Sequence, residues 1–278
     1  MAEKPTIQAF FDEPTNTVSY LVADPATKKA AVVDPVLDYD HNAGTVDTRS
    51  VEVILKAADE AGYGVKWVLE THAHADHLSG APLIKAKTGA KIGIGEHIKD
   101  VQRIFRPIFN ATDLVTDGSD FDHLFQDGER FKIGNLEAEV LYTPGHTPAD
   151  VSYKIEDAVF VGDTLFMPDY GTARADFPGG DAHQLYRSIK RLQALPPETR
   201  LFMSQMGQSC RFRPIAGSPL ASGSDPTADI DRSPLASKRQ SDIGRTRKLA
   251  QTIMCTRRVT LLDDDILSST SPRARKPL

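Results

Sequence analysis

Residues 67–80 read Trp-Val-Leu-Glu-Thr-His-Ala-His-Ala-Asp-His-Leu-Ser-Gly, an apolar run that leads into a group of histidines. The apolar start predicts a buried strand. Three imidazoles and one carboxylate follow within six residues: His72, His74, Asp76 and His77. These side chains bind borderline divalent metals, and a metal site needs several of them close together. A lone histidine is usually structural, but this density of ligand-type residues predicts a metal site.

Two later predicted strands also lead into ligand-type residues. The strand over 136–142 leads to His146, and the strand over 158–161 leads to Asp163. If these strands and the strand before His72 share one edge of the sheets, the three side chains converge there. Glycines at 145 and 162 allow the backbone to turn tightly beside two of them. We therefore predict that His72, His146 and Asp163 bind metal.

Two kinds of chemistry fit these residues. Two histidines and one carboxylate leave one face of a metal open, which suits Fe(II) and O2. Alternatively, His74, Asp76 and His77 hold a second ion, and two ions bridged by Asp163 generate hydroxide for hydrolysis. The residues alone leave both options open.

Composition limits the class of protein. The chain has 278 residues, 40% of them hydrophobic and 26% charged, which is typical of a globular domain. A net charge of −5 argues against nucleic acid as a partner. There is no apolar run long enough to span a membrane, no signal-peptide pattern at the N-terminus, and too few cysteines for a disulfide framework. We therefore expect a cytoplasmic protein, and we leave a homodimer open.

The order of predicted elements indicates the fold class. Strands predicted over 7–12, 18–23 and 30–33 precede the metal-site stretch, and strands and helices alternate after it. The polar segment 38–44 predicts a loop. This order predicts an α/β (α+β) fold in which two sheets pack face to face with helices outside.

Three motifs carry a resemblance to the metallo-β-lactamase superfamily. They are Thr-His-Ala-His-Ala-Asp-His at 71–77, Thr-Pro-Gly-His-Thr-Pro at 143–148 and Val-Gly-Asp-Thr-Leu-Phe at 161–166. Residues 1–203 resemble the glyoxalase II-like branch, and within it the persulfide dioxygenases. The most discriminating segment is Met-Pro-Asp-Tyr-Gly-Thr-Ala-Arg-Ala-Asp-Phe-Pro at 167–178. The resemblance implies an αββα sandwich, with residues 1–203 as the catalytic domain.

The resemblance also implies an activity and a cofactor. Family members bind one Fe(II) per chain at the positions of His72, His146 and Asp163. They oxidise glutathione persulfide with O2 to sulfite and glutathione. The alternatives are a glyoxalase II-type thioester hydrolase with Zn(II), one or two ions per chain, and a metal-binding but inactive variant.

Other positions follow from the same resemblance. His74, Asp76 and His77 would hydrogen-bond the ligands and bound water. Arg174 and Tyr170 would bind substrate, although Arg174 fits a surface ion pair equally well. The branch often has a cysteine where this chain has Ala175, so that position has no catalytic role here.

The resemblance ends after Met203. The family continues with His-Asp-Tyr, whereas this chain reads Ser-Gln-Met-Gly at 204–207, so Gln205 replaces the histidine of the second metal position. Residues 204–278 contain 13 Lys and Arg, 7 Asp, no Glu and 11 Ser, and repeat Ser-Pro-Leu-Ala-Ser at 218–222 and 233–237. We expect a basic, largely disordered tail and a sandwich incomplete at its C-terminus. The tail is either genuine or the product of a reading-frame shift near codon 204.

Overall fold

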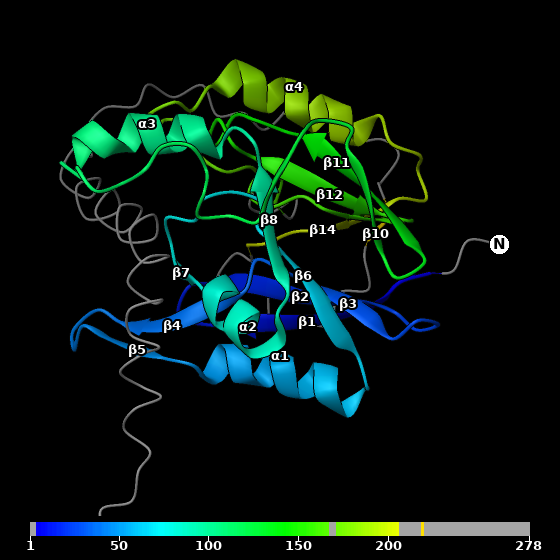
Figure 1. The fold of residues 1–278 in the computed structure, drawn as a ribbon. Coiled ribbons are helices and arrows are strands. Elements are labelled where there is room, and N and C mark those ends of the chain that lie inside the picture. Colours follow the sequence, from blue (N-terminus) through cyan, green and yellow to red (C-terminus); the bar gives the residue numbers. More distant parts are fainter. Residues whose placement is uncertain (1–3, 167–170, 206–217, 220–278) are drawn as a thin grey trace, which may run out of the picture.

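A computed structural model of the chain describes residues 4–166, 171–205 and 218–219. Two six-stranded sheets pack face to face (Figure 1). The first has the order β1-β2-β3-β6-β8-β9. Its strands are β1 (Thr6–Asp12), β2 (Thr17–Asp24), β3 (Lys29–Val33), β6 (Gly64–Leu69), β8 (Lys91–Gly95) and β9 (His123–Phe125).

The second sheet has the order β10-β11-β12-β13-β14-β15. Its strands are β10 (Arg130–Ile133), β11 (Leu136–Tyr142), β12 (Val151–Ile155), β13 (Ala158–Phe160), β14 (Arg200–Phe202) and β15 (Ser218–Pro219). A small third sheet joins β5 (Thr45–Asp47), β4 (Val36–Asp40) and β7 (Leu78–Ser79).

Helices cover the outer faces of both large sheets (Figure 1). Helices α1 (Arg49–Glu60) and α2 (Ala81–Thr88) lie on the first sheet, whereas α4 (Ala182–Gln193) lies on the second. Helix α3 (Ile98–Ile108) packs against residues from the end of β8 and from the loops beside the site. This αββα arrangement confirms the predicted fold class. Within the part of the chain that the structure describes, no helix is both long and apolar enough to cross a membrane.

Strand β2 shows why the sandwich forms. All eight of its residues are buried, because alternate side chains face the second sheet and the helices. Tyr20 packs edge-on against Phe160 and Phe202 of the second sheet, with ring centroids 5.2 and 5.5 Å away. Such aromatic pairs contribute about 0.5–1.5 kcal/mol each beyond the burial of their area.

The segment predicted as a loop at 38–44 differs in the structure. Strand β4 runs through Asp40, pairs with β5, and also pairs with β7 immediately after the histidine stretch. The loop prediction was right for 41–44, which form the turn of this hairpin, and wrong for 38–40, which pair with β5 although their mostly polar side chains give no apolar alternation that indicates a strand.

Candidate metal centre

The C-terminal ends of several strands meet at one edge of the sandwich. Strands β3 and β6 are parallel, as are β13 and β14, so the residues that follow each pair emerge on the same side. The two sheets are joined there, because the Val151 amide donates to the Thr71 carbonyl over 2.9 Å. The predicted convergence of strand ends is therefore present.

His72, His146 and Asp163 form one buried cluster. The Nε2 atoms of the two histidines each lie 3.8 Å from Asp163 Oδ2, and the imidazole centroids are 5.2 Å apart. The potential ligand atoms all lie within 4.8 Å of one another. His72 Nε2 and Asp163 Oδ1 are buried and make no hydrogen bond. Buried polar atoms without partners carry a substantial desolvation cost, and a cation held between them would remove it.

The hydrogen bonds of the two imidazoles leave their Nε2 lone pairs facing this cluster. The Thr71 hydroxyl donates to Asp34 Oδ2 over 2.8 Å, so its oxygen accepts from His72 Nδ1 at 3.0 Å. His146 Nδ1 donates to the Arg174 carbonyl over 2.7 Å. In both rings Nδ1 carries the proton, which is the tautomer that a metal ligand through Nε2 requires.

The electrostatics of the cluster also suit a cation. Burial, together with neighbouring His74 and His146, lowers the pKa of His72 well below its ordinary value, so the ring is neutral. Burial raises the pKa of Asp163 to about 7, with Asp76 adding to the effect and His146 opposing it. A divalent ion would reverse the shift at Asp163, because it favours the ionised carboxylate. The donor set therefore fits a metal.

His74, Asp76 and His77 form a second group whose potential ligand atoms lie within 4.8 Å of one another. His74 Nε2 lies 3.1 Å from Asp34 Oδ1 and 3.2 Å from Glu70 Oε2. Burial favours neutral His74, but these two carboxylates outweigh it and raise the pKa of His74 well above its usual range. The His74 ring contacts one imidazole of each group: its centroid lies 4.1 Å from that of His72 in the first cluster and 4.2 Å from that of His77.

Two glycines allow the loops to approach this closely. Gly162 has a φ of +55°, and a Cβ there would lie 2.6 Å from Thr71 Oγ1. Gly145 has a φ of +148°, and a Cβ there would collide with the Leu185 backbone at the start of α4. Any larger residue would push Asp163 or His146 away from the cluster.

Two residues that the sequence reasoning missed support the ligands. Asp34 contacts both Thr71 and His74, and Glu70 lies beside the same His74 nitrogen while accepting from the Ser79 hydroxyl. Asp34 directly follows β3, so the strand-end rule that found His72 and Asp163 would also have found it.

Of the two predicted substrate-binding residues, the structure describes one. The Arg174 guanidinium pairs with both carboxylate oxygens of Asp176 at 2.5 and 2.6 Å and lies 4.9 Å from the Phe177 ring centroid. Its own backbone carbonyl is the group that orients His146. Tyr170 lies outside the described residues.

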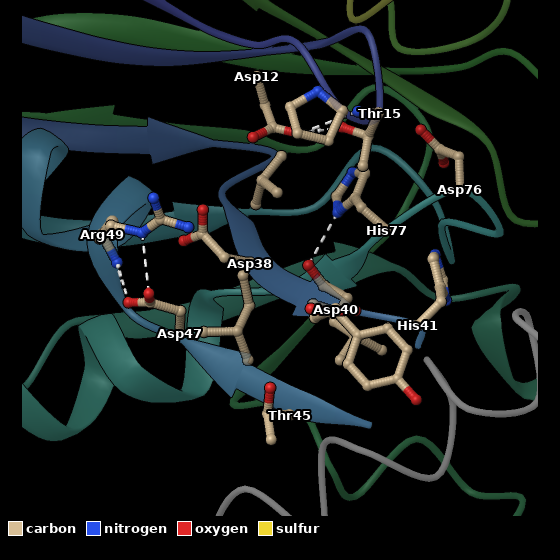
Figure 2. A pocket seen from close by; sticks show the side chains of 15 residues that line it. Asp12, Thr15, Asp38, Asp40, His41, Thr45, Asp47, Arg49, Asp76 and His77 are labelled. Atoms are coloured by element: carbon tan, nitrogen blue, oxygen red, sulfur yellow. Dashed lines mark hydrogen bonds and ion pairs between the residues drawn. The ribbon is translucent and has the colours of Figure 1, made fainter. Parts of the chain in front are cut away.

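A cavity of about 270 Å³ opens beside the second group (Figure 2). Asp76 and His77 contribute to its wall, and the β4–β5 hairpin contributes Asp38, Asp40 and Asp47. Arg49 also lines it, but its guanidinium lies 2.8 Å from the Asp47 carboxylate. The cavity is therefore an acidic space that reaches the histidine stretch from the hairpin side.

Comparison with known proteins agrees with this geometry. Residues 12–204 match the family model of the metallo-beta-lactamase superfamily, so the chain belongs to this superfamily. The structure places the ligand-type residues of this family domain in groups that could hold a metal ion.

Two relatives and one solved structure show which members of the superfamily the chain resembles. A beta-lactamase hydrolase-like protein from Agrobacterium fabrum is 52% identical over 201 residues, covering 72% of this chain and 47% of the relative. The chain thus spans about half the length of that protein. A hydroxyacylglutathione hydrolase from Methylococcus capsulatus is 36% identical over 66% of this chain and 59% of its own length. The crystal structure of ETHE1 from Myxococcus xanthus superposes with a TM-score of 0.59 and 29% identity, covering 74% of this chain and 77% of that one.

Proposed function

We propose that residues 1–203 form an Fe(II)-dependent persulfide dioxygenase that oxidises glutathione persulfide with O2 to sulfite and glutathione. One ion would be held by His72, His146 and Asp163. The observation that carries the proposal is the buried cluster of two imidazole Nε2 lone pairs and one carboxylate. The motif at 167–178 and the similarity to ETHE1 support the persulfide branch of the superfamily.

The reaction balances with O2 as the only oxidant. The outer sulfur of the persulfide goes from the zero to the +4 oxidation state and loses four electrons, which O2 accepts. One water supplies the third oxygen of sulfite, the S–S bond breaks, and glutathione leaves as the thiol with two protons released. Ferrous iron held by His72, His146 and Asp163 would supply the electron transfer between the two substrates.

The chain's own residues would hold this centre and shield it from bulk water. Asp34 fixes the Thr71 hydroxyl, and that hydroxyl fixes the His72 ring. The Arg174 carbonyl fixes the His146 ring in the same way. Because all of these groups are buried or nearly so, the ligands are set in place before an ion arrives.

A second function is favoured by a separate observation. His74, Asp76 and His77 could hold a second ion, and the similarity to a hydroxyacylglutathione hydrolase points to thioester hydrolysis. Two ions would activate water for attack on a glutathione thioester. Both candidates use a small-molecule thiol derivative.

The test is oxygen consumption by Fe(II)-loaded protein given glutathione persulfide, with sulfite measured in parallel. We expect uptake and sulfite in equal amounts, abolished by His146→Ala. The matched control is His183→Ala, an exposed histidine on α4, which should retain activity. Folded, iron-loaded protein that consumes no O2 would rule out the dioxygenase. Hydrolysis of a glutathione thioester by the same sample would then support the second candidate, and its absence the inactive variant.

A further inference from the structure

Residues 171–181 form an irregular segment that lies against the loop of His146. The segment contains no helix or strand and leads into α4. At its end, the Asp181 amide donates to the Gly145 carbonyl over 2.9 Å. Since no strand pairing holds residues 174–177, their position beside the imidazole depends on side-chain contacts.

Two groups of this segment contact the same His146 ring. The Arg174 carbonyl accepts from His146 Nδ1 over 2.7 Å. The Phe177 ring meets the imidazole nearly at right angles, with centroids 5.1 Å apart and an interplanar angle of 88°. The first contact fixes the Nδ1 proton, and the second limits the rotation of the ring. A shift of residues 174–177 would therefore disturb both.

The Arg174 guanidinium connects the residues that make these contacts. Its Nε and Nη2 atoms donate to the two carboxylate oxygens of Asp176 over 2.5 and 2.6 Å, the two-pronged pairing that arginine favours with a carboxylate. Its central carbon lies 4.9 Å from the centroid of the Phe177 ring, within the range of a cation–π interaction. The backbone of Arg174 thus orients His146, while its side chain holds Asp176 and Phe177.

The pairing with Asp176 also occupies one edge of the guanidinium at which a substrate carboxylate could bind. A carboxylate on Nε and Nη2 would have to displace Asp176. We propose that Arg174 is a positioning residue, which holds residues 174–177 against His146 through Asp176 and Phe177, and that it does not bind substrate at this edge. The inference rests on the proposed function only in that His146 would be a metal ligand, and it applies to either candidate reaction.

The test follows the His146 ring and metal binding in the full chain without substrate. In metal-free protein, NMR gives the rate at which the Nδ1 proton of His146 exchanges with water, and His146→Ala assigns the signal. Competition with a chromogenic chelator gives the affinity for Co(II). We expect Arg174→Gln and Asp176→Asn each to speed the exchange and to weaken Co(II) binding by about 10-fold, the low end for groups that orient a ligand. Arg103→Gln is the matched control and should change neither quantity, because this exposed arginine pairs with Asp100 within α3.

Asp176→Asn separates positioning from substrate binding, because it leaves the charge of Arg174 intact. If Arg174 bound the substrate, Asp176→Asn would change neither quantity, and Arg174→Gln would only raise the KM for glutathione persulfide. The variant with both substitutions should bind Co(II) no more weakly than either single variant, because the two side chains act as one unit.

Three results would overturn the proposal. The first is an exchange rate or a Co(II) affinity that stays at the wild-type value in Asp176→Asn, whose exposed side chain can be replaced without unfolding the chain, as a thermal melt would verify. The second is a double variant in which the two losses add. The third is a wild-type Nδ1 proton that exchanges too fast to be observed. If the wild type bound no metal, the proposed function would fail, and the exchange rates would still decide this inference.

Discussion

His74 Nε2 lies 3.1 Å from Oδ1 of Asp34, a fully buried carboxylate. The same carboxylate accepts hydrogen bonds from the amide and hydroxyl of Thr71 and from the hydroxyl of Ser204, each over 2.8 Å. Asp34 therefore joins the ends of β3, β6 and β14 under both groups of ligand-type residues. Its pKa is held low although burial raises it, because His74 and the Thr71 donors favour the charged form.

Replacing Asp34 should damage both stability and metal binding. Asp34→Ala removes one of the two buried carboxylates that face His74, and breaking a buried ion pair typically costs about 3–5 kcal/mol. Metal affinity should fall by about 10- to 100-fold, as is usual when a group that orients a ligand is lost. Urea unfolding and metal titration measure the two effects. Asp59→Ala at the exposed end of α1 is the control, and equal losses in both variants would contradict the role given to Asp34.

The Thr71 hydroxyl should matter through its oxygen and not through its size. Thr71→Val is nearly isosteric but cannot accept from His72 Nδ1, so the ring loses the contact that fixes its tautomer. We expect metal affinity to drop by about 10-fold or more, while Thr71→Ser, which keeps the hydroxyl, retains most of it. Competition with a chromogenic chelator gives the affinities. If the two variants bind metal equally well, the hydroxyl does not orient His72.

Gly145 should tolerate no side chain. In Gly145→Ala the new Cβ would meet the backbone of Leu185, which cannot move without displacing α4. Such overpacking typically costs about 1–3 kcal/mol, and the shift of the neighbouring His146 should also weaken metal binding. Gly89→Ala is the matched control, because Gly89 has a φ of +71° but no atom within 4 Å of the position that a Cβ would take. That variant should lose stability through backbone strain and leave metal binding unchanged; a loss of metal in both would argue against the steric explanation.

The main elements and the first cluster could be predicted from sequence because their signals are local. Alternating apolar residues specify β2 and β11, and a helical apolar stripe specifies α4. Ligand-type residues at the ends of predicted strands marked His72 and Asp163 as candidates, but the two follow β6 of the first sheet and β13 of the second, so their meeting comes from the packing of the sheets. Three motifs then indicate the family, which the comparison with known proteins supports.

What sequence could not provide were contacts between distant segments. The start of β4 pairs with β7, and the orientation of Gln205 depends on Thr17 and Asp76, which lie far from it in the chain. By contrast, the ion pair of Arg174 with Asp176 is local, and it matches the surface ion pair that the sequence left open beside substrate binding. Of the predicted tail, the structure describes only 204–205 and 218–219. Ser204 and Gln205 join the fold by pairing with the start of β2.

The pair formed by Asp157 and Arg200 gives a prediction of pH dependence. Arg200 donates to both oxygens of Asp157 at 3.0 and 2.7 Å, which links β13, the strand before Asp163, to β14, the strand before Gln205. Hydrogen bonds from Arg200, with Lys4 also close, hold the pKa of Asp157 below its ordinary value even though partial burial opposes them. A carboxylate whose pKa is depressed by folding stabilises the protein above its unfolded pKa, and that stabilisation is lost as the pH falls through the folded pKa.

Asp157→Asn should therefore lower the free energy of unfolding at pH 5 to 8 by up to about 1 kcal/mol, the range for a solvent-screened ion pair. For a chain of this size that corresponds to a fall in Tm of roughly 2–4 °C. The difference between variant and wild type should shrink as the pH falls below the ordinary aspartate pKa of about 4 and then through the lower pKa of folded Asp157, because protonation removes the charge that faces Arg200. Thermal melts across pH 3 to 8 measure it, with Asp59→Asn as an exposed control that should show no such trend. A difference that stays constant down to pH 3 would mean that the pair stabilises through packing and not through charge.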